Sequence, residues 1–451
     1  MQRTMNMLKQ NGERWALVVI LLLAAALRLH NVAWDGGKLV HPDERSTVAF
    51  YAPTMHWPQD WSTAFDPKQS SFNPLWDPVG QQRRSYTYGH FPLYLLTITA
   101  NAVRALAPLA QRLGASAELV NSLTSATDIQ GFAFIGRVIM ALSDTATVYL
   151  VYLIARRLYR RGAALLAAAL SAFTVLQIQL AHFFAVDPIS TTFTLLALYG
   201  AMLMFERRTR GAAVLTGVGM ALAVASKFSA MPILAAPVMA ALLITLLDKG
   251  EDRATARAQA LRHLILACLV AFIVFALTSP FVLLDWPNFM QAVVREQGAM
   301  VRGIADMPFT RQYRGTMPYV YFIGQQLRWG MGLPLGVVAF LGLAWVLVRA
   351  VLRRAQPGEW ILLSWIVPYF GATGLFLAKF MRYMVPLVPL FTLMGAGLLV
   401  QVSKSAGRRF AHSQIRILTY LLIVVTLGGA VFWSLAFVNG VYGPEHTWIT
   451  A

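Results

Sequence analysis

Two adjacent carboxylates, Asp43 and Glu44, stand in the sequence HPDER at positions 41–45. Such a pair can serve a general base, hold a metal ion or simply support the fold. Asp43 could also cap a helix over Glu44–Tyr51, because an aspartate side chain accepts hydrogen bonds from the free backbone N–H groups at a helix start. A cap and a base are compatible roles, since capping fixes the direction of the carboxylate.

A third acidic residue, Asp187, precedes Pro188 in a short turn between two apolar segments. Pro188 fits the first position of a helix and Asp187 the cap before it. The same turn is expected at the membrane face that carries Asp43, with His182 just before it. Asp43 and Asp187 are therefore candidate ligands of a divalent metal ion, a cofactor whose presence the sequence leaves open.

Two cations, Lys227 and Arg382, stand at the expected outer ends of apolar segments. Cations near the end of a span often reach for the lipid headgroups. Their convergence with two carboxylates would instead suit a phosphate leaving group beside a catalytic base. Arg137 and Asp144 lie within one apolar segment, and seven residues rise about 10 Å along a helix, so each is expected to pair with a neighbour.

The elements that position these residues are membrane helices. Of the 451 residues, 57% are hydrophobic and 13% are charged, whereas a soluble domain carries roughly 25% charged residues. Cys268 is the one cysteine, which excludes an intrachain disulfide and a cysteine metal cluster. Eleven segments are predicted to span: Trp15–Leu29, Gly131–Ile154, Ala163–Ala181, Ile189–Phe205, Gly211–Ala230, Pro232–Leu247, Leu264–Leu284, Gly332–Val351, Trp360–Leu377, Met384–Val400 and Ile417–Val438.

Clusters of arginine and lysine set the predicted orientation. They precede the first span and follow the second, fourth, eighth and tenth, so all fall on one side if the N-terminus is cytoplasmic. The net charge of +18 fits such loops better than nucleic-acid binding. Phe91–Ala110 is long enough to span, but counting it would place the cluster after Ile154 outside. We therefore predict an amphipathic helix at the outer interface.

This count makes residues 1–438 one membrane module. Its first exterior loop covers 31–130, a second exterior segment covers 285–319, and 439–451 form an exterior tail that ends a truncated or short chain. The proposed chemical groups all precede the tail, so deleting Tyr442–Ala451 is expected to leave activity intact. Tryptophans in the first loop fit sugar stacking or an interfacial aromatic belt equally well: Trp34, Trp57, Trp61 and Trp76.

The layout resembles the GT-C membrane glycosyltransferases, in particular the family 39 group of protein O-mannosyltransferases and the aminoarabinose transferases of lipid A. HPDER is similar to that group's Asp-Glu motif, GHFPLY at 89–94 to its Pro-Pro-Leu-Tyr segment with Phe91 in place of the first proline, and Asp187 to its second exterior acid. SKF at 226–228 resembles its phosphate-neighbouring lysine segment, and RYMVPLVP at 382–389 its Arg-Tyr-x-x-Pro-x-x-Pro helix. The resemblance covers nearly the whole chain.

The resemblance implies an all-α GT-C fold and an inverting glycosyltransferase of the cell membrane, working at the exterior face with a cytoplasmic N-terminus and an exterior C-terminus. The donor would be a polyprenyl-phosphate-linked sugar, hexose or pentose, and the acceptor a lipid, glycan or protein hydroxyl. Asp43 would be the general base beside Glu44. The donor phosphate would be bound by Lys227, Arg382 and Arg137, and the remaining substrate-binding candidates are His41, Tyr88, His90, His182 and Asp187.

Two other functions remain open from the sequence. A secondary transporter could use Arg137, Asp144 and Asp187 as coupling residues, but repeated halves and short loops would be expected of it. A sugar-lipid binding scaffold would differ only in lacking turnover. No P-loop, dinucleotide fingerprint, HExxH zinc site or nucleophile elbow occurs in the chain, so a nucleotide-sugar donor is not indicated.

Overall fold

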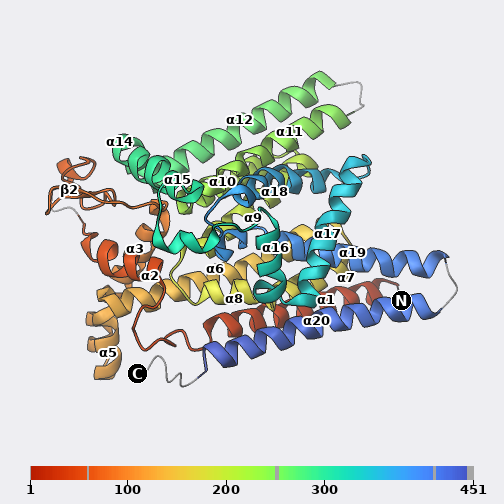
Figure 1. The fold of residues 1–451 in the computed structure, drawn as a ribbon, viewed down its shortest axis with the longest axis horizontal. Helices are drawn as coiled ribbons and strands as arrows, with labels where there is room; N and C mark the ends of the chain where they lie inside the picture. Colours follow the sequence, from red (N-terminus) through yellow and green to blue (C-terminus); the bar gives the residue numbers. More distant parts are fainter. Residues whose placement is uncertain (1, 58–59, 249–252, 410–412, 444–451) are drawn as a thin grey trace.

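The computed structural model describes residues 2–57, 60–248, 253–409 and 413–443. It is a bundle of long helices with smaller elements gathered at one end (Figure 1). The long helices are α1 (Gln2–Leu29), α6 (Ile129–Leu158), α7 (Arg161–Ala172), α8 (Val175–Ala181), α9 (Val186–Arg207), α10 (Arg210–Ser226), α11 (Ala235–Leu247), α12 (Arg253–Thr278), α17 (Leu333–Val351), α18 (Pro357–Leu375), α19 (Val388–Arg409) and α20 (Ser413–Val441).

Two further groups of elements follow α1 and α12. After α1 come α2 (Pro42–Ser46), a π-turn η1 (Thr47–Tyr51), 3₁₀ turns η2 (Ala52–Thr54) and η3 (Trp61–Thr63), a hairpin of β1 (Trp76–Asp77) and β2 (Gln82–Arg83), then α3 (His90–Ala105), α4 (Ala107–Arg112), α5 (Ala117–Thr124) and η4 (Ser125–Thr127). A 3₁₀ segment η5 (Phe228–Leu234) precedes α11. After α12 come α13 (Pro280–Leu284), α14 (Trp286–Phe289), π-helical η6 (Met290–Gln297), α15 (Gly298–Arg302), η7 (Pro308–Tyr313), α16 (Val320–Gln325) and η8 (Gln326–Gly330), and η9 (Met381–Met384) precedes α19.

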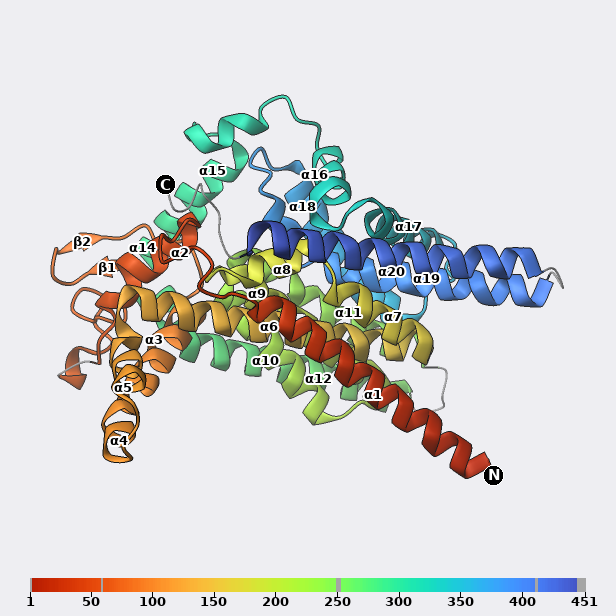
Figure 2. The same ribbon diagram turned by 90° about the horizontal axis from the view of Figure 1, so that it is seen from below.

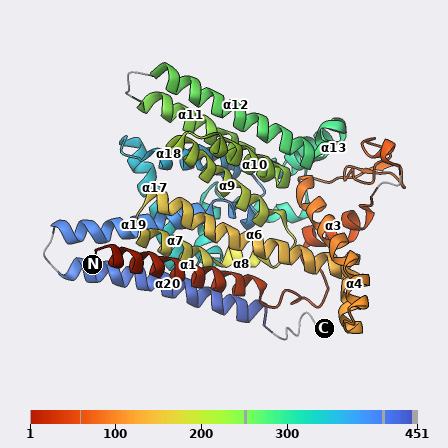
Figure 3. The ribbon, with the colours of Figure 1, turned by 180° about the vertical axis from the view of Figure 1, so that it is seen from behind.

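The prediction of an all-α polytopic membrane protein is confirmed. Each of the eleven predicted spans is mainly helical, although Ala163–Ala181 is broken into α7 and α8 with a 53° bend. Three helices end before the predicted ends of their spans: α10 at Ser226, α12 at Thr278 and α18 at Leu375. α19 begins at Val388, after the predicted start at Met384. By length and composition, seven described helices are apolar enough to cross a membrane, or eight if the bent pair counts as one. One of these seven helices is His90–Arg112, which the sequence predicts to lie at the outer interface. In Figures 2 and 3, α3 and α4 run crosswise to the long helices at the end of the bundle, as an interfacial segment would.

Small residues let the central helices approach closely. A Cβ added at Gly342 of α17 would stand 2.2 Å from the backbone nitrogen of Gly395 in α19, and one at Gly219 of α10 would stand 2.6 Å from that of Ala197 in α9. In a lipid environment, where helices gain little from burying apolar surface, such backbone contact is a main source of packing energy. The rigid centre of the bundle therefore rests on glycine at these crossings.

The basic clusters meet at one end of the bundle. α19 ends and α20 begins at the end where α1 starts (Figure 1). Ion pairs join the helix ends there: Arg156–Glu13 at 2.9 Å, Arg157–Glu206, Arg208–Asp248 at 2.7 Å and Arg349–Glu359 at 3.2 Å. The clusters thus share one end, and α2 to α5 and α13 to α15 lie toward the other (Figure 1).

Candidate active site

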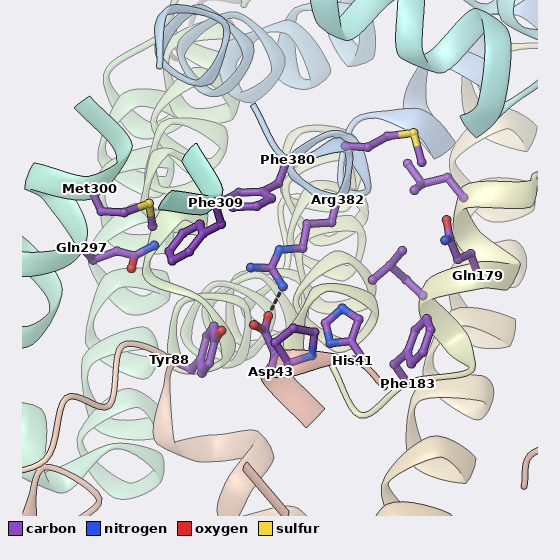
Figure 4. A pocket seen from close by; sticks show the side chains of 14 residues that line it. His41, Asp43, Tyr88, Gln179, Phe183, Gln297, Met300, Phe309, Phe380 and Arg382 are labelled. Atoms are coloured by element: carbon purple, nitrogen blue, oxygen red, sulfur yellow. Dashed lines mark hydrogen bonds and ion pairs between the residues drawn. The ribbon is translucent and has the colours of Figure 1, made fainter. Parts of the chain in front are cut away.

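Asp43 faces a cavity at the end of the bundle opposite the basic clusters. Pro42 starts α2 with the fixed φ that favours the first helical turn, and the N-cap is His41, which makes no side-chain capping bond. The predicted capping role of Asp43 is therefore wrong. The cavity has a volume of about 500 Å³ (Figure 4). Its lining comprises His41, Pro42, Asp43, Tyr88, Leu176, Gln179, Leu180, Phe183, Gln297, Met300, Phe309, Phe380, Met381 and Arg382.

Asp43 is ion-paired with Arg382, which comes from η9, 339 positions further along the chain. The guanidinium also lies 5.2 Å from the centre of the Phe380 ring. Figure 4 shows the pair in the middle of the cavity, with the His41 ring beside it. Burial, followed by the charges of Arg382 and Arg137, lowers the pKa of His41 to about 3, so this ring is neutral at physiological pH.

Glu44 turns away from the cavity and supports the fold. Its carboxylate receives two hydrogen bonds from Arg137, at 2.8 and 2.7 Å, and one from the backbone N–H of Phe184 at 2.9 Å. Arg137 also binds both oxygens of Asp35, at 3.0 and 2.7 Å. Burial opposes ionisation of Asp35, but the hydrogen bonds and charge of Arg137 outweigh it and keep the pKa of Asp35 below its ordinary value. Glu44 and Arg137 line neither this cavity nor the second one described below, and their predicted catalytic and phosphate-binding roles stay predictions.

A second cavity of about 190 Å³ contains Lys227. The Lys227 ammonium is 2.5 Å from Oδ1 of Asp187 and 5.0 Å from the centre of the Tyr383 ring. Asp187 lies in the first turn of α9 and the N-cap is Ala185, so its predicted capping role is also wrong. The second cavity is lined by Thr87, Tyr88, Lys227, Phe228, Ser229, Val293, Gln297, Gly298, Val301, Tyr369, Thr373, Phe376 and Tyr383.

Gly89 brings the first loop against the Lys227 segment. Its N–H donates to the carbonyl of Ser226 at 3.0 Å, and a Cβ at this position would stand 1.8 Å from the carbonyl oxygen of Ala225. No larger residue fits without moving the backbone. This contact fixes Tyr88, the residue before Gly89, between the two cavities.

Two predicted substrate-binding histidines lie outside both cavities. His90 is fully buried between Tyr86 and Tyr94. His182 is buried too, with Nδ1 2.8 Å from the carbonyl of Ile178 and Nε2 2.9 Å from that of His30. Burial is the main cause that lowers the pKa of His182 to about 4. Their predicted roles remain untested, and the ring of Phe183, next to His182, takes the place in the cavity wall.

Tyr442, the residue that follows α20, holds the segment around His182. Its ring stacks on His182 with a centroid distance of 3.8 Å and meets Trp34 edge-on at 5.1 Å. Asn31 donates from Nδ2 to the Tyr442 carbonyl at 2.9 Å, and the Tyr442 hydroxyl donates to the carbonyl of Gln179 at 3.3 Å. Because Gln179 lines the larger cavity, Tyr442 supports its wall.

The remaining charged candidates form separate buried pairs. Asp144 accepts from Arg28 at 2.5 Å and from Gln177 at 2.9 Å, so it pairs with neighbours and not with Arg137, as the sequence predicts. Sequence reasoning missed Arg28, Gln179, Gln297 and Tyr442, since no spacing or motif marks them.

The candidate metal ligands each have a cation as partner. Asp43 pairs with Arg382 and Asp187 with Lys227. Within the described residues, no three histidine, cysteine, aspartate or glutamate side chains form a group that could hold a metal ion.

The chain matches a family model over part of its length. Residues 123–282 match the model described as dolichyl-phosphate-mannose-protein mannosyltransferase. No curated protein matches the sequence significantly. The matched residues include α6, α9, α10 and α12 and carry Asp187 and Lys227, but they exclude Asp43 and Arg382.

The fold resembles solved membrane transferases. The Archaeoglobus fulgidus oligosaccharyltransferase, tethered with an acceptor peptide containing the NVT sequon, aligns with a TM-score of 0.54 and 15% identity over 98% of this chain and 56% of its own. ArnT from Cupriavidus metallidurans aligns with a TM-score of 0.56 and 16% identity in the apo state, over 96% of this chain and 77% of its own. ArnT bound to undecaprenyl phosphate aligns with a TM-score of 0.53 and 15% identity, over 96% of this chain and 75% of its own. This chain thus spans little more than half of the oligosaccharyltransferase. The expected GT-C fold is confirmed.

Proposed function

We propose that this chain, which has the fold of the GT-C membrane glycosyltransferases, moves a sugar from a polyprenyl-phosphate donor to an acceptor hydroxyl. Asp43 takes the proton of that hydroxyl as its oxygen bonds to the anomeric carbon. The bond from this carbon to the phosphate oxygen breaks, its electron pair leaves with the lipid phosphate, and the configuration inverts. A hexose or a pentose fits this scheme.

Arg382 and Lys227 would meet the charge of the departing phosphate. A guanidinium presents parallel N–H groups that match two phosphate oxygens, whereas the ammonium acts as a point charge. In a partly dry cavity such fixed charges stabilise a leaving group more strongly than water does. Asp187, 2.5 Å from the Lys227 ammonium, would hold that ammonium in place.

We place this chemistry at the exterior face of the cell membrane. The arginine-rich helix ends share one end of the bundle with the start of α1, and both cavities are lined by segments of the opposite end. If the basic end is cytoplasmic, as the positive-inside tendency requires, the N-terminus is inside and the donor is reached from the outer leaflet.

One observation carries the proposal: Asp43 and Arg382, 339 positions apart, meet in one cavity of a GT-C fold. The undecaprenyl phosphate of the ArnT structure and the family description supply the class of donor. The transporter alternative gains no such support, because Arg137, Asp144 and Asp187 belong to three separate ion-pair groups.

The test is transfer in proteoliposomes from radiolabelled polyprenyl-phosphate mannose, glucose and arabinose to acceptors in added membranes. We expect label to move from at least one donor. Asp43→Asn keeps the shape but removes the proton acceptor, so it should lower turnover roughly 10²–10⁴-fold. Asp128→Asn is the matched control, because Asp128 is exposed before α6, at the same end of the bundle, and its side chain makes no hydrogen bond or ion pair with any residue that the structure describes.

Donor binding separates catalysis from folding. Asp43→Asn protein that still binds the donor and unfolds at a normal temperature, yet transfers poorly, supports the base. Near-normal turnover in this variant would remove Asp43 from the mechanism. Donor binding without turnover in the native chain would favour the scaffold alternative.

A further inference from the structure

Two residues connect the cavities of the candidate site. Within the described residues, only Tyr88 and Gln297 line both. We infer that the Gln297 carboxamide binds a hydroxyl group of the transferred sugar and so helps to select the donor. This inference rests on the proposed function and assigns a substrate-reading residue to it.

The chemistry of displacement puts the sugar at this junction. The attacking and leaving oxygens must approach the anomeric carbon from opposite sides in an inverting reaction. Asp43 lies in the larger cavity and Lys227 in the smaller one, while Arg382 contacts Asp43. A sugar whose phosphate points to Lys227 and whose anomeric carbon faces Asp43 must therefore lie beside Tyr88 and Gln297.

The backbone on both sides of Gln297 is fixed by contacts to other segments. Before it, the Glu296 carboxylate receives hydrogen bonds from Arg83 Nη2 and Ser85 Oγ, both at 2.5 Å. After it, the carbonyl of Val301 accepts from the N–H of Leu377 at 2.9 Å. The backbone that carries Gln297 is thus held by both the first loop and the segment before Arg382.

The Gln297 carboxamide itself is left free for a ligand. It is half-buried, and no described residue makes a hydrogen bond to its side chain. Figure 4 shows it pointing into the cavity next to Phe309 and Met300. A buried or half-buried amide without a protein partner costs free energy unless water or a ligand satisfies it.

A carboxamide suits a sugar hydroxyl. It offers one acceptor and two donors without charge, so it can pair with a hydroxyl in either sense and does not compete for the phosphate. Tyr88, which also lines both cavities, adds an aromatic face and a phenolic hydroxyl. Recognition of this kind discriminates strongly, because a donor that lacks the hydroxyl leaves the amide unpaired.

The test crosses enzyme variants with donor analogues. Gln297→Leu keeps the approximate size and removes the hydrogen bonds, and we expect kcat/KM for the preferred donor to fall about tenfold or more. Polyprenyl-phosphate mannose, glucose and their single deoxy analogues are then compared in both proteins. Gln111→Leu is the control, since Gln111 is exposed on α4 and lines neither described cavity.

The expected result is specific to one hydroxyl. For one deoxy donor, native protein and Gln297→Leu should transfer at rates within about twofold of each other, because the lost partner is then absent from both, while other donors keep the full penalty. An equal penalty for every donor would mark Gln297 as structural, and no penalty would remove it from the site. Native protein that transfers from no polyprenyl-phosphate sugar would overturn the proposed function itself, and this inference with it.

Discussion

The contribution of Tyr442, the buried residue that follows α20, can be tested by two truncations that differ by two residues. One removes 442–451 and the other removes 444–451, so only the first takes away Tyr442. From the sequence, deleting 442–451 is expected to leave transfer intact. The structure gives the opposite expectation, because Tyr442 is 1% exposed and contacts His182, Trp34 and Gln179.

The size of the effect follows from these contacts. Truncating a buried aromatic side chain to alanine costs about 3–5 kcal/mol, so Tyr442→Ala should destabilise the chain by that amount. Tyr442→Phe keeps the ring against His182 and removes only the hydroxyl bond to Gln179, which is worth about 1 kcal/mol. The shorter truncation should behave like the full chain.

Thermal unfolding in detergent and donor transfer are measured on the native chain and on all four variants. We expect stability and transfer to decrease from the native chain to Tyr442→Phe and further to Tyr442→Ala. The 442–451 deletion should be affected at least as much as Tyr442→Ala. The reasoning is refuted if the 442–451 and 444–451 deletions share one unfolding temperature and one transfer rate. Equal stability with unequal transfer would place the effect of Tyr442 on the cavity wall alone.

Three further outcomes are expected. Lys227→Met should weaken donor binding or slow transfer without unfolding the chain. Arg382→Lys should also be damaging, because an ammonium cannot reproduce two parallel N–H contacts to a phosphate. Unchanged donor kinetics would return both residues to a purely interfacial role. Single cysteines at Ser85 and Ser116, in a chain whose own cysteine is replaced, should both react with an impermeant reagent from outside, whereas opposite sidedness would mean that His90–Arg112 spans. Burial lowers the pKa of His182 to about 4, against about 6.5 in the unfolded chain, so the unfolded state binds more protons between these two values. The stability of the fold should therefore fall as the pH drops through this window. Thermal unfolding at pH 7.5 and pH 5 should show a smaller fall in His182→Gln.

The sequence predicted the helices and the shared end of the basic clusters because these depend on local composition. Each predicted span is mainly helical, and the arginine-rich helix ends form ion pairs with one another at one end of the bundle. The bend between α7 and α8 could not be foreseen, since Thr174 stands in an apolar run with no proline or glycine to mark a break.

The candidate site was only partly predictable. Motifs marked Asp43 and Arg382, which the fold brings into contact. They did not show that Glu44 turns to Arg137, because the direction of a side chain is set by a partner on another helix. Gln297 carried no signal at all, since its role arises where two cavities meet.

The ion pair between Asp43 and Arg382 has a consequence for the order in which substrates add. In this pair, Nη1 of Arg382 donates to Oδ2 of Asp43. A phosphate that takes the guanidinium releases the carboxylate, so we expect the donor to bind first and the acceptor to bind productively only afterwards. The empty enzyme then offers no free base to activate water. The spent lipid phosphate should hold Arg382 in the same way, forming a dead-end complex that competes with the donor while still admitting the acceptor.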